Sequence, residues 1–172
     1  MTTLPDPPLS PDELVSTSQE RAVLEAFLDL YRDIVVKKVT GLSTKAAHQR
    51  LVPSATTLAG LVCHLASVER EWFHAILGER PPAEVGVKVA DDGWSVGSEH
   101  SIDELVEDYQ RACADSRQLA ARFSLEDAVP HSRLGRVSLR WIYVHMIEET
   151  ARHAGHADIL REQTDGAVGF DS

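Results

Sequence analysis

The chain has 172 residues, of which 43% are hydrophobic and 26% charged, and its formal net charge is -10. This length suits one domain with a substantial core, and the composition argues against a disordered chain. Because an acidic protein is repelled by phosphate backbones and anionic lipid, neither nucleic acid nor a membrane surface is an expected partner. Cys63 and Cys113 are far apart in sequence, which argues against a disulfide scaffold or a cysteine-based zinc site.

The N-terminal region reads as an arm rather than as a targeting segment. Residues 1–12 lack the basic and hydrophobic stretches of a signal peptide, and no apolar run approaches the roughly 20 residues that a spanning helix needs. We therefore expect a cytoplasmic protein. Prolines are concentrated at the start of the chain, which predicts a flexible, proline-rich arm over residues 1–17. Ser10 and Glu13 could cap a short helix within it, and residues 164–172 are expected to form a C-terminal tail.

Four segments have apolar residues at spacings of three and four, which is the period of one helix face. The expected helices cover residues 18–39, 58–77, 101–123 and 138–163. Long connecting loops are predicted over residues 79–100 and 124–137, where glycine and proline recur without a sustained period. In the first of these loops, Trp94 is expected to pack against the body of the protein. No segment alternates convincingly as a strand does, so the sequence predicts an all-α, four-helix bundle over residues 18–163.

Three polar residues lie on faces that are otherwise apolar, where an unpaired polar group would cost on the order of 1–3 kcal/mol. His64 is in the middle of the apolar face of the second expected helix. Glu149 and His153 are four residues apart in the last helix, so they point the same way. If the two helices are neighbours, these side chains form a divalent-metal ligand set with a position open for water or substrate. The alternative is a structural hydrogen-bond cluster.

Other side chains of the last helix leave the choice of ligands open. His145 or His156 could replace one of the three residues, or could support a ligand through a hydrogen bond. Arg152, beside the site, could orient an anionic substrate. His74, near the end of the second expected helix, is expected to be exposed to solvent.

Several common catalytic motifs are absent from the sequence. The absence of GxxxxGK[ST] and GxGxxG argues against P-loop nucleotide hydrolysis and the usual dinucleotide fold. The absence of HExxH argues against the corresponding zinc peptidases. A carboxylate-bridged di-iron bundle needs Glu-x-x-His motifs on two helices, but here residues 71–74 hold the only one.

Two segments resemble the DinB-like superfamily of metal-binding four-helix bundles, and within it an actinobacterial mini-circle-protein branch. Residues 53–73, PSATTLAGLVCHLASVEREWF, are similar to the second helix of that family, whose histidine is a metal ligand. Residues 139–156, LRWIYVHMIEETARHAGH, are similar to its fourth helix. Family members commonly carry a His-x-x-x-His pair there, and in this chain Glu149 replaces the first histidine. The resulting His, Glu, His set resembles that of the mycothiol-dependent maleylpyruvate isomerases.

The resemblance covers about residues 19–163 and implies a metal site made of His64, Glu149 and His153. Zinc is the expected metal, with nickel or iron as alternatives, and Arg152 and His156 are expected to contact substrate. The implied function is a metal-dependent transfer of a low-molecular-weight thiol such as mycothiol, or an isomerisation, with small electrophiles as substrates. A homodimer is also implied. Two other functions stay open: a hydrolase that uses a metal-bound water, and a non-catalytic helical stress-response binding module.

Overall fold

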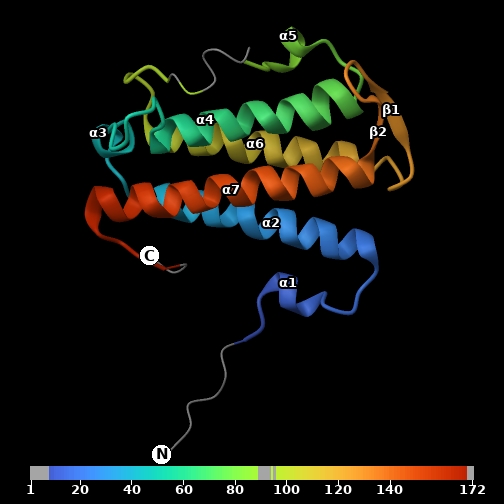
Figure 1. Cartoon of the computed structure of the whole chain (residues 1–172), viewed down its shortest axis with the longest axis horizontal. Coiled ribbons are helices and arrows are strands. Elements are labelled where there is room, and N and C mark those ends of the chain that lie inside the picture. The colour runs from blue at the N-terminus through green and yellow to red at the C-terminus, as the bar shows by residue number, and fades with distance from the viewer. Residues whose placement is uncertain (1–7, 89–93, 95, 170–172) are drawn as a thin grey trace, which may run out of the picture.

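The computed structural model describes residues 8–88, 94 and 96–169, and about 63% of these residues are helical. The long helices lie side by side, with a small two-stranded sheet at one end (Figure 1). In chain order, the elements are α1 (Pro11–Leu14), α2 (Glu20–Val39), α3 (Thr44–Ala47), α4 (Leu58–Glu69), the π-helix η1 (Arg70–Leu77), α5 (Pro82–Val85), α6 (Ile102–Ala120), β1 (Ala128–His131), β2 (Gly135–Ser138) and α7 (Leu139–Asp165). Within the described residues, no helix is both long and apolar enough to cross a membrane.

Helix α7 is the element that positions the site, because it packs along α2 and also contacts α4. Helix α4 in turn packs along α6, and η1 continues it without a break. Side-chain caps define where these helices begin. The hydroxyl of Thr57 accepts a hydrogen bond from the Gly60 amide, and the hydroxyl of Ser138 accepts one from the Trp141 amide. Ser101 and Glu104 form a capping box at the start of α6.

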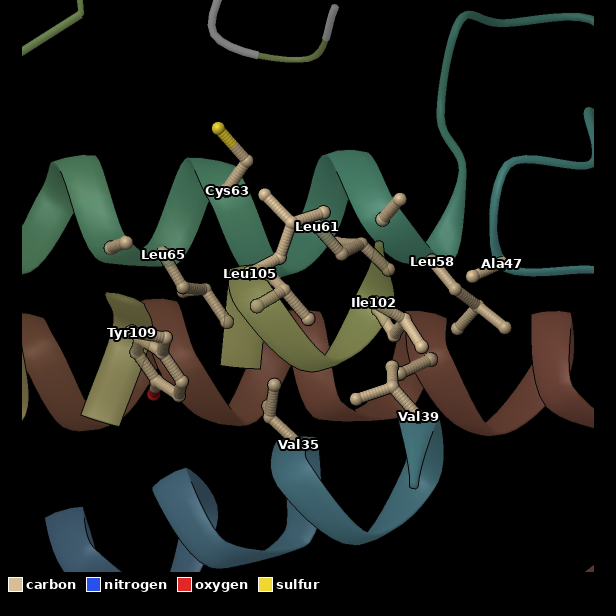
Figure 2. Packing of buried hydrophobic residues seen from close by; sticks show 14 of the residues in the cluster. Val35, Val39, Ala47, Leu58, Leu61, Cys63, Leu65, Ile102, Leu105 and Tyr109 are labelled. Atoms are coloured by element: carbon tan, nitrogen blue, oxygen red, sulfur yellow. The ribbon is translucent and has the colours of Figure 1, made fainter. Parts of the chain in front are cut away.

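The core consists of two groups of buried apolar side chains. The larger group fills the space between α2, α4 and α6, where Val35, Leu61 and Leu105 point toward one another (Figure 2). Cys63 points away from this space, on another side of α4 (Figure 2). The second group lies toward the hairpin and includes Phe73 and Met146. Burial of this apolar surface is the main force that holds α4 and α7 beside each other.

A buried ion pair also joins α2 to the last residue of α4. Arg32 donates two hydrogen bonds to Glu69, from Nε at 2.8 Å and from Nη2 at 2.6 Å. Its remaining Nη1 donates to Asp29 at 2.8 Å. Burial by itself would lower the pKa of Arg32, but the Glu69 carboxylate raises it above its ordinary value. Arg32 is therefore charged in the folded protein.

The sequence predicted a loop over residues 124–137, and this prediction is wrong in part. Strands β1 and β2 pair antiparallel there, with Val129 opposite Val137 and both buried. Each strand has four residues, and Pro130 interrupts the first, so the segment carries too little alternation to be recognised. The fold is therefore mostly helical rather than all-α. Other boundaries also differ, since α5 lies within the expected loop 79–100 and α6 ends at Ala120.

The second expected helix changes character at Arg70, where the α-helix gives way to η1. Its C-terminal end has the wider hydrogen-bond spacing of a π-helix, with the Gly78 amide bonded to the Phe73 carbonyl at 2.9 Å. Wider turns rotate the following side chains relative to an α-helical continuation. His74, expected to be exposed, is 8% exposed and lies 3.2 Å from the Ser116 hydroxyl, measured from Nε2 to Oγ. The expectation of a solvated His74 is wrong for this reason.

Candidate metal centre

The three residues singled out in the sequence lie together between α4 and α7. The Nε2 atoms of His64 and His153 are each 3.1 Å from the same oxygen, Glu149 Oε1. All three donor atoms lie within 4.8 Å of one another. The side chains of His64 and Glu149 are 21% and 15% exposed, and that of His153 is 6% exposed. One side of this cluster is therefore accessible to a small molecule.

The local folding of the chain explains this convergence. His64 lies between Leu61 and Leu65, which are buried on α4, so its side chain is carried toward the neighbouring helix. Glu149 and His153 are separated by four residues of α7, close to one helical turn, which places them one above the other. The sequence placed these side chains at one site only if their two helices are neighbours, and α4 and α7 are in contact.

Hydrogen bonds define the charge state of the cluster. Those from His153 and His64 hold the pKa of Glu149 well below its usual range, although partial burial opposes this shift. Glu149 is therefore an anion at neutral pH. Two imidazole nitrogens and a carboxylate oxygen from two helices are a donor set typical of catalytic zinc sites, and they leave at least one position open. The residues present thus fit a divalent cation.

His156 contacts the ring nitrogen of His153 that does not face Glu149. Its Nδ1 is 3.3 Å from Nδ1 of His153, whose Nε2 faces Glu149. A histidine that offers Nε2 to a metal carries its proton on Nδ1, and this proton needs an acceptor. With a cation at Nε2, the proton of His153 would be on Nδ1, where Nδ1 of His156 is the acceptor within reach. The contact therefore suits the tautomer in which Nε2 of His153 acts as a ligand.

Trp94 covers another side of the cluster. Its ring is stacked on the imidazole of His64, with centroids 4.4 Å apart and an angle of 14°, and it meets His153 edge-on at 5.2 Å. The contact requires Gly60, because a Cβ atom at this position would lie 2.6 Å from the Trp94 carbonyl oxygen. The sequence indicated that Trp94 packs on the body but not where. The glycine one turn before His64 was the available signal.

Arg152 lies at the edge of the cluster of His64, Glu149 and His153, and His145 lies outside this cluster. Arg152 is about half exposed, pairs with Glu148, and places Nη1 3.6 Å from Glu149 Oε2. His145 packs between Trp72 and Trp141, with ring centroids 4.4 and 5.2 Å away. Among the described residues, the group of possible metal donors comprises His64, Glu149 and His153 and does not include His145.

Comparison with known proteins places these residues in a family. No curated protein matches the chain. A family model described as mycothiol-S-transferase (MST) matches residues 23–166, which include α4, α7 and all three residues of the cluster. The match covers most of the chain and confirms the DinB-like resemblance seen in the sequence. The chain belongs to the mycothiol-S-transferase family, within the DinB-like superfamily.

Proposed function

We propose that this protein is a metal-dependent mycothiol S-transferase built on a DinB-like four-helix bundle. The observation that carries the proposal is the convergence of His64, Glu149 and His153 on one point, in a chain of the mycothiol-S-transferase family. We propose these three residues as the ligands of a divalent metal, with zinc first and nickel or iron as alternatives. We also propose that the protein is a homodimer and that it is cytoplasmic.

Each side chain around the site has a role in this proposal. Glu149 supplies the negative charge that balances a cation, and His156 keeps Nε2 of His153 available. Trp94 restricts the rotation of the His64 ring and shields it from water. When bound, a divalent cation supplies the Lewis acidity that keeps a coordinated thiol ionised at neutral pH. The exposed guanidinium of Arg152 suits an anionic group of a substrate, and His156 is also placed to touch substrate.

The proposed reaction is a substitution at an electrophilic carbon. The thiol gives up its proton, its sulfur forms a bond to that carbon, and the leaving group departs with the electron pair of the broken bond. One thiol and one electrophile give one thioether and one equivalent of acid. Because the site is accessible to solvent on one side, the thiol and the electrophile can enter from the same face.

Transfer of mycothiol to 1-chloro-2,4-dinitrobenzene, followed by absorbance, tests the proposal. We expect turnover with zinc-loaded protein, and the uncatalysed rate after chelation or in His153→Ala. His100→Ala is the matched control, since this exposed histidine lies outside the cluster. Turnover that persists after chelation would contradict the proposal. Release of the leaving group at the same rate without thiol would identify a hydrolase.

A further inference from the structure

A pocket opens beside the metal centre, between α7 and the connection that precedes α4. Its volume is about 240 Å³. The lining residues are Val52, Ser54, Thr56, His156, Ile159 and Leu160. None of these described lining residues is a lysine, arginine, aspartate or glutamate, and most of the exposed lining is apolar. The pocket therefore favours an uncharged, apolar group.

His156 connects this pocket to the proposed metal ligands. It is one of the lining residues, and its Nδ1 lies 3.3 Å from Nδ1 of His153. The two imidazole centroids are 5.3 Å apart. A molecule seated in the pocket would thus lie about one side chain away from the metal centre. This distance suits a substrate whose bulk occupies the pocket while its reactive carbon reaches toward the cluster.

The size of the pocket narrows the class of substrate. An apolar cavity of about 150 Å³ is large enough to bind benzene. At about 240 Å³, this pocket has room for one aromatic ring or a short branched alkyl group and a few further atoms. Two hydroxyl-bearing residues, Ser54 and Thr56, could hydrogen-bond to a polar substituent on that group.

From these observations, we infer that the pocket beside His156 binds the uncharged aryl group of the electrophilic substrate. The inference rests on the proposed function for the identity of the reaction, but not for the binding itself. Ile159 lines the pocket from α7 and is 57% exposed. The size of its side chain therefore determines how much of the pocket the substrate can occupy. Ile159 is a specificity-determining residue that touches the part of the substrate away from the reacting carbon.

Two variants test the inference. Ile159→Trp fills the pocket, whereas Val144→Trp adds the same bulk at a position on α7 that is 54% exposed and outside the pocket lining. The first measurement is binding of the unreactive probe 4-nitrobenzyl alcohol to zinc-loaded protein, followed by ligand-observed NMR. We expect Ile159→Trp to weaken binding by about tenfold or more, and Val144→Trp to leave it unchanged. Equal binding by Ile159→Trp and wild type would overturn the inference.

The second measurement compares mycothiol transfer to 4-nitrobenzyl chloride and to the smaller iodoacetamide. We expect Ile159→Trp to raise the KM for the aryl electrophile by about tenfold and to leave that for iodoacetamide within about twofold. An equal effect on both electrophiles would overturn the inference. Absence of transfer to either electrophile in wild type would contradict the proposed function, while the binding measurement would still decide the role of the pocket.

Discussion

At the scale of single residues, the proposed metal site gives the contact between His156 and His153 a role in metal affinity. In the proposed metal-bound form, Nδ1 of His156 accepts the Nδ1 proton of His153 and thereby orients the ring whose Nε2 faces Glu149. We expect His156→Phe to weaken zinc binding by about 10- to 100-fold, because such supporting contacts have effects of this size. Competition with a chromophoric chelator measures the affinity. Gly155→Ala, one residue away with open space around it, is the control, and equal affinities in both variants would refute this role.

A second residue-scale prediction concerns His74 and acid stability. Burial lowers the pKa of His74 below its ordinary value of 6.5. As the pH falls through 6.5, the unfolded chain binds a proton at this residue before the folded protein does, so the stability contributed by neutral His74 is present at higher pH and is lost on acidification. We expect the free energy of unfolding of His74→Gln to vary less between pH 7 and 5 than that of wild type. Urea denaturation of wild type and His74→Gln, both treated with a chelator to remove metal, measures the free energy of unfolding at each pH. The same pH dependence in both proteins would contradict the prediction.

At the scale of elements, a glycine in α4 and one in α7 should respond in opposite ways to the same substitution. Gly155→Ala meets nothing within 4 Å, so the better helix former should stabilise α7 by about 0.5–1 kcal/mol. Gly60→Ala places a Cβ 2.6 Å from the Trp94 carbonyl oxygen, so Trp94 must shift relative to His64. We expect altered tryptophan fluorescence and weaker zinc binding in Gly60→Ala alone. The same behaviour in both variants would argue against a role for Trp94.

The ion pair between α2 and α4 gives a second prediction at this scale. Glu69→Ala leaves the guanidinium of Arg32 buried with its main partner removed, which should destabilise the fold by about 3–5 kcal/mol. Arg140→Ala breaks ion pairs to Glu20 and Glu126 that are exposed, and it should change stability little. Guanidinium denaturation compares the two. A small effect of Glu69→Ala would show that water hydrates Arg32 in its place.

The sequence predicted elements whose periodicity is sustained and missed those that depend on distant contacts. The apolar repeats through Leu61, Leu65 and Val68 indicated a helix, and α4 forms there. The metal-centre residues were recognisable because polar side chains on apolar faces are costly. By contrast, the contact of His74 with Ser116 depends on how α6 packs against η1, which no local pattern encodes. The hairpin was missed because its strands are too short to show alternation.

At the scale of the whole molecule, the proposed metal centre joins α4 and α7, two helices that are far apart in sequence. The ligand set exists only when these helices are packed, so a bound metal stabilises the folded state alone. At a free zinc concentration about 100 times Kd, the gain is about 2.7 kcal/mol. We expect zinc to raise the melting temperature of wild type and to have no effect on Glu149→Gln. A similar rise in both proteins would place the zinc elsewhere.

The central claim is that His64, Glu149 and His153 hold one divalent metal, and metal content by elemental analysis tests it most directly. The protein should be purified without an affinity tag or chelator, and wild type compared with His64→Ala and with the control His100→Ala. The account predicts about one zinc, nickel or iron per chain in wild type and in the control, and a loss of that metal in His64→Ala. Wild-type protein that takes up no metal even after reconstitution would contradict it, and the three residues would then be a structural hydrogen-bond cluster.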